Sequence, residues 1–537
     1  MIRLRNLLVL ALCFGLLSAC SGPQASRIDA TATAESGTSL AQTNTPAPVA
    51  ISATPASAAT PTATLPAPTP ASVAPTTPPP VATPTAPATA TVANTPILAP
   101  EPTVNPAPVS QRVDLPDIDA HYQLTIDELR LGDGFVSASE TITIREFRGA
   151  IPEQLYLQVV PAAFGFFTLR LLTVDGVATE PGTLNDGFTL VVDLTPETAA
   201  PLVIGVEFSL SVGVDPTGWG PTTLDTGILR LGNWFPVISN DHGYSTILDP
   251  SYTAIADFDV SVTLDAGYAF AHTGEIAQER EEVDGRVTYD LRAIDVRDFG
   301  LVVSRGFVVD EATTSAGVRV ALYTTAAGSD ARQNILVWAV DAIERMSELI
   351  APYPYQSLRI VDAGPSMPGG LELPGLIYIN ERYPAMERLI CHEVAHQWLY
   401  GVIGTRTLDD GWIDEGGAEF FERGLPTGFT EVPEPPAGGY LYPLDASYRE
   451  LAGAAFIDGY HAIYEQGARL YYAVLDAMGW DAFWASMRGL YDTHAFGIVT
   501  AWDVLGNWQR HSAADLRPLL HEYFRYDWID LLPEPGG

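Results

Sequence analysis

The chain has 537 residues, with 65 Asp or Glu against 28 Lys or Arg, and its formal net charge is −37. This charge excludes nucleic acid as a partner and argues against docking on anionic lipid, because both are polyanions. An acidic cleft would instead favour positively charged ligands, such as the free amino terminus of a peptide.

Residues 1–19 have the pattern of a bacterial secretory signal. Arg3 and Arg5 precede an apolar run over 7–17 that is too short to span a bilayer. The sequence Leu17-Ser-Ala-Cys20 resembles the lipobox, in which the cysteine is lipidated and becomes the mature amino terminus. Dual acylation anchors a protein stably, so we expect an extracytoplasmic, membrane-anchored lipoprotein at the cell surface or in the periplasm. An ordinary signal peptide cleaved nearby is the alternative.

Residues 20–112 form a low-complexity tract of Pro, Thr, Ala and Ser. Such a composition cannot bury a core, and it predicts an extended chain that is partly polyproline II. We interpret this tract as a tether between the lipid on Cys20 and the folded part of the chain.

Residues 113–310 alternate between apolar and polar side chains with a period of two. Examples begin at Tyr122 and Phe135, with turns expected at 132–134 and 186–187. Many short strands without a convincing helix predict a β-sandwich or saddle domain.

The period changes after Tyr323, and residues 311–537 predict a small mixed sheet followed by helices. The segment 330–350 has the pattern of an amphipathic helix that stops before Pro352. A strand is expected at 358–361, and the segment from Gly369 is expected to be an edge strand that can hold an extended peptide. Further helices are predicted at 460–478, 480–491, 500–510 and 514–524. The predicted fold class is therefore α+β.

His392-Glu393-Val394-Ala395-His396 has the pattern of a catalytic metal site. Histidines at i and i+4 lie on one face of a helix, so their imidazoles can converge on one ion. Glu393 is placed to act as a base on water at that ion. The helix is predicted to end at Gly401 and Gly404.

Glu415 follows after eighteen residues and supplies the third ligand that a catalytic zinc needs. It opens a predicted helical run from Trp412, in which Glu415, Glu419 and Glu422 form one carboxylate stripe. The sequence therefore predicts one Zn²⁺ per chain, held by His392, His396 and Glu415.

Four motifs together resemble the membrane alanine aminopeptidase family of gluzincin metallopeptidases. They are Gly369-Gly-Leu-Glu-Leu-Pro-Gly-Leu-Ile-Tyr-Ile, His392-Glu-Val-Ala-His-Gln-Trp, Trp412-Ile-Asp-Glu-Gly and Tyr464-Glu-Gln-Gly. They occur in the family's order and cover about 369–467. The region before them resembles the family's amino-terminal domain more loosely, best at Trp234-Phe-Pro-Val. The resemblance implies a thermolysin-like catalytic domain and a peptide substrate.

The resemblance also implies roles for further residues. Glu372, after Gly369 and Gly370, matches the glutamate that binds the substrate's amino group, and Tyr464 matches the tyrosine that hydrogen-bonds the oxyanion. Glu422 corresponds to a carboxylate that orients a zinc histidine, and we place Glu419 in the same outer layer.

Two positions depart from the family pattern. Leu373 stands where the family has Asn, and Gln466 where it has Lys, so substrate preference is in question rather than activity. About seventy residues follow Tyr464, fewer than the family's carboxy-terminal helical domain needs, and we expect a more open cleft.

The expected reaction is peptide hydrolysis by zinc-activated water. Glu393 would take the proton of the water and pass it to the leaving amine, while Tyr464 stabilises the oxyanion. An aminopeptidase is the favoured hypothesis. A zinc endopeptidase or specialised peptidase on the same fold and a non-catalytic surface scaffold are the alternatives. Cys391, beside His392, is expected to pack in the core rather than bind metal, because it points about 100° away around the helix.

Overall fold

The structure is a computed structural model that describes residues 115–536 apart from 216–219, 244–251, 326–329 and 452–453. The described residues all belong to one unit, Ile97–Gly537. The predicted signal peptide at 1–19, the lipidated Cys20 and the tether at 20–112 lie outside the described residues and stay predictions.

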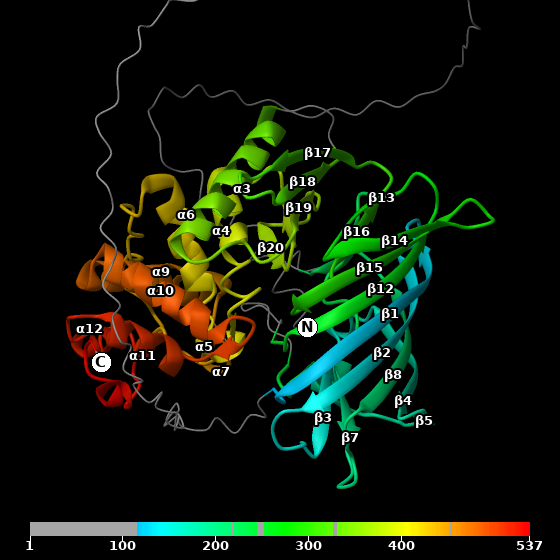
Figure 1. Ribbon diagram of the computed structural model, residues 1–537, viewed down its shortest axis with the longest axis horizontal. Coiled ribbons are helices and arrows are strands. Elements are labelled where there is room, and N and C mark those ends of the chain that lie inside the picture. Colours follow the sequence, from blue (N-terminus) through cyan, green and yellow to red (C-terminus); the bar gives the residue numbers. More distant parts are fainter. Residues whose placement is uncertain (1–114, 216–219, 244–251, 326–329, 452–453, 537) are drawn as a thin grey trace, which may run out of the picture. The chain divides into compact units, whose positions relative to one another are not determined.

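The first part of the described chain is built on an eight-stranded sheet (Figure 1). Its strands, in sheet order, are β14 (Glu275–Glu281), β15 (Val287–Val296), β12 (Ala256–Leu264), β1 (Ile118–Arg130), β2 (Phe135–Phe147), β8 (Leu202–Ser211), β4 (Phe167–Val174) and β5 (Val177–Ala178). Neighbours pair antiparallel except β1 and β12, which are parallel. Every second residue of β1 from Ile118 to Ile126 is buried, because successive side chains of a strand point to opposite faces.

Two four-stranded sheets complete this β-rich part. One contains β13 (Ala269–His272), β16 (Leu301–Ser304), β10 (Ile228–Leu231) and β9 (Thr222–Asp225), and the other β11 (Val237–Ser239), β3 (Gln154–Gln158), β7 (Thr189–Asp193) and β6 (Gly182–Leu184). Their inward residues share one apolar core with the large sheet, and this core includes Trp234 and Phe235. The predicted sandwich is thus confirmed, with one short helix, α2 (Val160–Ala163), and a 3₁₀ turn, η1 (Asn185–Gly187), at the predicted turn.

A five-stranded mixed sheet follows. In sheet order it contains β17 (Val308–Thr313), β18 (Arg319–Thr324), β19 (Ser357–Asp362), β21 (Leu376–Ile379) and β20 (Gly370–Leu373). The three central strands are parallel, while β17 and β20 pair antiparallel at the two edges. The long helix α3 (Asp330–Leu349) packs on β17 and β18. The predicted mixed sheet and edge strand are confirmed.

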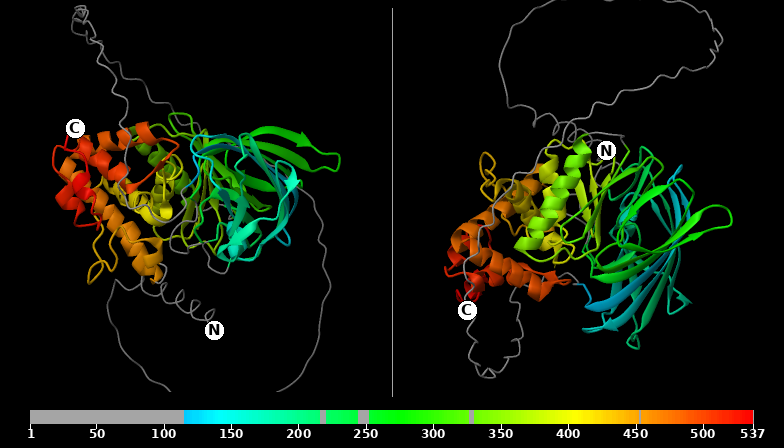
Figure 2. Two further views of the ribbon diagram at one scale, coloured as in Figure 1. Left: turned by 90° about the horizontal axis from the view of Figure 1, so that it is seen from below. Right: turned by 45° about the horizontal axis from the view of Figure 1, so that its top comes forward.

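Helices dominate the remainder. They are α4 (Met386–Ala395), α5 (Thr407–Asp410), α6 (Glu415–Thr427), α7 (Tyr448–Leu451), α8 (Phe456–Tyr460), the π-helical η2 (His461–Glu465), α9 (Gln466–Met478), α10 (Trp480–His494), α11 (Ala501–His511), α12 (Arg517–Leu520) and the 3₁₀ turn η3 (Ile529–Leu531). Two short strands, β22 (Gly404–Thr405) and β23 (Ile498–Val499), pair in parallel. Figure 2 shows these helices, coloured yellow to red, gathered away from the strands of the eight-stranded sheet. They enclose a second apolar core that includes Trp398, Trp412, Phe420 and Trp508.

Two predicted helices end differently. The helix predicted over 514–524 is wrong: α12 spans four residues, because the Ser512 hydroxyl and the Gln509 side chain bind the backbone N–H groups of Ala514 and Leu516. The helix predicted to run to Gly401 ends at Ala395, and its carboxyl end turns so that Gly401 N–H donates to His396 O at 2.8 Å.

Candidate metal centre

Helix α4 brings His392 and His396 together. The helix is buried from Leu389 to Ala395, because its apolar side chains join the second core. The two histidines are one turn apart, and their Nε2 atoms lie 3.1 Å from each other. His396 is the C-cap residue of the helix. Because the two histidines are one turn apart, both rings face the same point.

Helix α6 supplies the third candidate ligand atom, a carboxylate oxygen of Glu415. Asp414 caps its amino end, accepting from Glu415 N–H at 2.8 Å and from the Thr405 hydroxyl at 2.6 Å. Glu415 Oε2 then lies 3.4 Å from His392 Nε2 and 3.3 Å from His396 Nε2. In tetrahedral zinc sites with bonds of about 2.0–2.2 Å, ligand atoms lie roughly 3.3–3.6 Å apart. The three predicted ligands therefore form a triangle close to the size that zinc requires.

The charges around this triangle also suit a cation. Burial lowers the pKa of His396, but the negative charges of Glu372 and Glu415 outweigh it and raise that pKa to about 9. Burial raises the pKa of Glu415, yet its hydrogen bonds to both histidines hold it well below its usual range. The protein thus surrounds two imidazoles with an excess of carboxylate, and a divalent cation would balance this charge.

The Nδ1 atoms of the two histidines, which point away from the candidate metal position, contact oxygen atoms of neighbouring residues. Glu422 Oε2 lies 3.2 Å from His392 Nδ1, at the position where the family resemblance implies an orienting carboxylate. His396 Nδ1 lies 3.1 Å from the carbonyl of Leu399. The Glu419 carboxylate accepts from Arg423 Nε at 2.7 Å and has a ligand atom within 4.8 Å of those of His392 and Glu422. Such contacts fix ring orientation and tautomer at metal sites.

Glu393 lies buried beside the histidines, beneath the edge strand β20. Burial raises the pKa of this carboxyl to about 7, against the opposing charges of the two histidines. A Cβ on Gly370 would fall 2.1 Å from Glu393 Oε1, so glycine is required for the strand to pass over the carboxylate. This close approach gives a physical reason for a glycine at position 370, two residues before Glu372.

Tyr464 reaches the cluster from the π-helical segment η2. Its hydroxyl donates to Glu415 Oε1 at 2.7 Å, and its ring stacks on His392 at a centroid distance of 6.1 Å. The segment can come this close because Gly416 and Gly467 meet back to back: a Cβ on either would lie 2.7 Å from the Cα of the other. The motifs Trp412-Ile-Asp-Glu-Gly and Tyr464-Glu-Gln-Gly are therefore in direct contact.

Glu372 lies on β20, is 8% exposed, and its charge acts on His396 and Tyr464. It therefore faces the cluster rather than open solvent. Gly369 directly precedes β20, and its carbonyl accepts from Asn380 N–H at 3.0 Å. Cys391 is buried, and burial raises the pKa of its thiol to about 12, so packing is its role in this structure.

This geometry can be set beside proteins of known identity. No protein-family model matches the chain. The chain is 23% identical over 468 residues to aminopeptidase N of Lactobacillus delbrueckii subsp. lactis, an alignment that covers 78% of this chain and 50% of that protein. It thus spans about half the length of this relative.

Solved structures show the same architecture. An M1 zinc metallopeptidase from Deinococcus radiodurans superposes with a TM-score of 0.58 at 20% identity, covering 79% of this chain and 97% of that one. Aminopeptidase A of Legionella pneumophila, in complex with aspartic acid, gives 0.60 at 15% identity and covers 77% and 50%. The chain has the M1 metallopeptidase fold. The predicted order of a β-rich domain followed by a mixed sheet and helices is that of the M1 structures.

Sequence reasoning missed Tyr460, which lies beside this centre. Tyr460 stacks on Tyr464 at a centroid distance of 4.7 Å, and its hydroxyl donates to Glu419 Oε2 at 3.2 Å. The sequence could have indicated Tyr460, because the two tyrosines are four residues apart, as are Glu415 and Glu419, and residues four apart lie on one face of a helix. The hydrogen bonds Tyr464–Glu415 and Tyr460–Glu419 are thus two successive contacts to α6, the first from η2 and the second from the end of α8.

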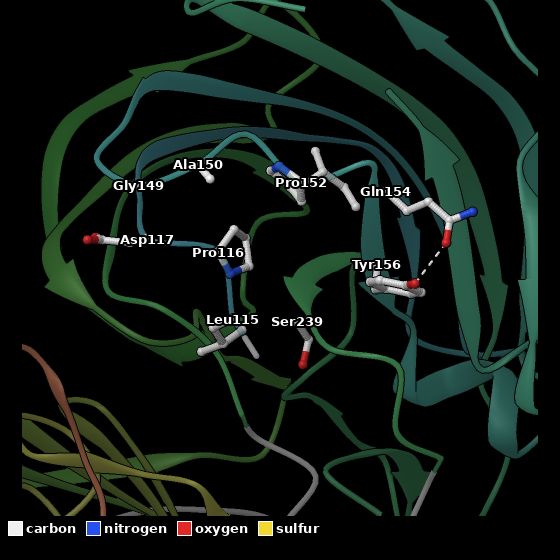
Figure 3. Close-up of a pocket in the computed structure, with 10 residues that line it drawn as sticks. Leu115, Pro116, Asp117, Gly149, Ala150, Pro152, Gln154, Tyr156 and Ser239 are labelled. Atoms are coloured by element: carbon white, nitrogen blue, oxygen red, sulfur yellow. Dashed lines mark hydrogen bonds between the residues drawn. The ribbon is translucent and has the colours of Figure 1, made fainter. Parts of the chain in front are cut away.

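A separate pocket lies in the β-rich part of the M1 fold (Figure 3). It has a volume of about 320 Å³, and Tyr156 donates to Gln154 Oε1 at 2.8 Å on its wall. Its lining offers one carboxylate, Asp117, and no histidine or cysteine. The metal-ligand chemistry therefore belongs to the α4–α6 centre.

Proposed function

We propose that this chain is a zinc metallopeptidase that removes amino-terminal residues from peptides. The observation that carries the proposal is the convergence of His392, His396 and Glu415 at 3.1–3.4 Å, with Glu393 and Tyr464 in the same cluster. A binding scaffold needs neither a buried base nor an oxyanion donor beside its metal ligands. The fold of M1 zinc metallopeptidases supports the proposal.

In this proposal each residue has a separate task. His392, His396 and Glu415 hold one zinc ion, which when bound polarises the scissile carbonyl and makes water a nucleophile at neutral pH. Glu393 takes the proton of the attacking water at its carboxylate and delivers it to the leaving amine. Its raised pKa suits a group that must both accept and release a proton. The Tyr464 hydroxyl donates to the oxyanion of the tetrahedral intermediate.

Glu372 defines the aminopeptidase character. Its carboxylate would pair with the substrate's free α-ammonium, and β20 would hold the peptide backbone as an edge strand does. A relative named aminopeptidase N and a structural neighbour described with a Tyr-Ser-Ala substrate support this assignment. The chain also covers 98% of a structure described as a two-domain M1 zinc metallopeptidase, so the described residues contain counterparts of both of its domains.

A lipid on Cys20 would anchor the enzyme outside the cytoplasm, with 20–112 as the tether. Within the described residues, no helix is both long enough and apolar enough to cross a bilayer. Metabolic labelling with a radioactive fatty acid tests the anchor. The full chain should be labelled and sediment with membranes, while a Cys20→Ser variant should lose the label. Equal labelling of both would rule out Cys20 as the lipid site.

The activity is tested with the full chain in detergent against Tyr-Ser-Ala and its amino-terminally acetylated form. Chelator-sensitive cleavage of the free peptide alone is the expected result. Cleavage of both at similar rates would identify an endopeptidase and remove the role of Glu372. Cleavage of neither by protein that holds zinc would favour the scaffold.

A further inference from the structure

Arg297 is a buried cation whose hydrogen bonds run to backbone carbonyls. It follows β15 in the β-rich part of the chain and is 1% exposed. Its Nε donates to Tyr400 O at 2.7 Å, its Nη1 to Thr253 O at 2.8 Å and its Nη2 to Val402 O at 3.3 Å. Nη2 also donates to Gly497 O. Arginine suits this position because its planar guanidinium offers five donors in a fixed fork, whereas lysine has one nitrogen.

Two of those carbonyls belong to the loop that directly follows His396. In that loop Tyr400 has φ 122°, a conformation that side-chain-bearing residues rarely adopt. The loop closes on itself through Tyr400 N–H to Ile403 O at 2.9 Å. Such a conformation persists only when surrounding contacts hold it, and the Arg297 guanidinium is such a contact on both sides of Gly401.

The same loop holds the outer nitrogen of His396. Leu399, whose carbonyl lies 3.1 Å from His396 Nδ1, directly precedes the carbonyl that Arg297 Nε binds. Gly404 ends the loop, and a Cβ there would fall 2.2 Å from Arg297 Cζ, so glycine is needed for the guanidinium to enter. The end of the loop at Gly404 therefore leaves space for the guanidinium of Arg297.

We propose that Arg297 is a positioning residue for His396. Arg297 fixes the positions of the Tyr400 and Val402 carbonyls, and through the backbone it fixes the orientation of the Leu399 carbonyl. The Leu399 carbonyl in turn orients the ring of His396 so that its Nε2 faces the metal. The inference rests on the proposed zinc site and gives the β-rich part a task in it: the metal centre is complete only when the chain around Thr253 and Arg297 is docked against the loop.

The test compares two buried arginines in the full chain. Arg297→Lys keeps the charge and loses the fork. The matched control is Arg359→Lys. Arg359 is 7% exposed and donates to His272 O at 3.1 Å and Gly274 O at 2.8 Å, so it also joins the catalytic part to the β-rich part, but from β19. Zinc affinity is measured by competition with a chromophoric chelator, and the geometry of the site by the visible absorption of the cobalt-substituted protein.

Arg297→Lys should weaken zinc binding by about 10- to 100-fold and change the cobalt spectrum. Arg359→Lys should lower the unfolding temperature while leaving both readouts at the wild-type values. Wild-type affinity and spectrum in a folded Arg297→Lys protein would overturn the inference, and so would equal losses in the two variants. A wild-type chain that binds no zinc would instead overturn the proposed function, and this inference with it.

Gly404→Ala provides a second route if Arg297→Lys fails to fold. The added methyl group displaces the guanidinium without removing it. The same weakening and spectral change are expected, and a wild-type spectrum in this variant would contradict the inference.

Discussion

Two regions of this molecule bury carboxyl groups in opposite ways. At the α4–α6 centre, Glu415 lies within 3.4 Å of two imidazoles, and its pKa is held below the usual range. In the β-sandwich, Glu140 is 2% exposed on the inward face of β2, and neither of its oxygens has a hydrogen-bond partner among the described residues. Burial raises the pKa of Glu140 well above its ordinary value.

The difference shows what makes buried charge chemically useful. A lone buried carboxyl takes up a proton and becomes neutral, since an isolated charge in an apolar core is costly. The Glu415 carboxylate, bonded to two histidines, stays charged and offers its oxygen to a cation. Burial alone therefore does not identify a site, whereas converging donors do.

The strongest way to break the cluster's chemistry while keeping its metal is Glu393→Gln. The amide is isosteric but cannot accept the proton of water, so we expect peptide hydrolysis to fall by roughly 10²- to 10⁴-fold with zinc still bound. Steady-state cleavage of Tyr-Ser-Ala and metal analysis of the same sample measure both. Glu387→Gln, on the exposed first turn of the same helix, should change neither. Full activity in Glu393→Gln would show that another group is the base.

Tyr464→Phe removes a single hydroxyl group from the α4–α6 centre. Losing an oxyanion donor should lower kcat by about 10²- to 10³-fold with little change in KM. Tyr460→Phe removes the neighbouring hydroxyl, which binds Glu419, and keeps the ring stack. We expect less than a tenfold loss there, and equal losses in the two variants would contradict a direct role for Tyr464.

Glu140→Gln tests the other side of the comparison. Because the folded-state pKa of Glu140 is raised above its unfolded value, its contribution to stability is full below the unfolded pKa of about 4.3 and is lost as the pH rises above it. The amide does not titrate, so the variant should gain stability over wild type by on the order of 1 kcal/mol per pH unit across that window. Denaturant unfolding at pH 5, 6 and 7 measures the difference in free energy of unfolding between variant and wild type. A difference that stays constant over these pH values would show that Glu140 is paired in solution and would contradict the prediction.

The convergence of the three candidate metal ligands could be predicted from the sequence because their spacing is local. Two histidines one helical turn apart must share a face, and Glu415 opens the next long helix. The strand alternation also predicted the sandwich. Glu140 could have been found from the same alternation, since it occupies an inward position between Ala138 and Ile142.

Other features depend on contacts distant in sequence. Helix α4 ends at Ala395, and Arg297, about a hundred residues earlier, binds two carbonyls of the loop that follows it. The π-helical turn that presents Tyr464 has no local sequence pattern, and the close meeting of Gly416 and Gly467 is visible only once both helices are packed. Tertiary packing decides such features, so propensity and spacing could not predict them.

The zinc content of purified variants tests the central claim most directly. Wild type and Glu140→Gln should each hold one zinc per chain by plasma mass spectrometry, while Glu415→Gln and His396→Ala should hold less than a tenth of that after dialysis. A wild-type chain without zinc, or one zinc per chain in Glu415→Gln and His396→Ala alike, would contradict the account.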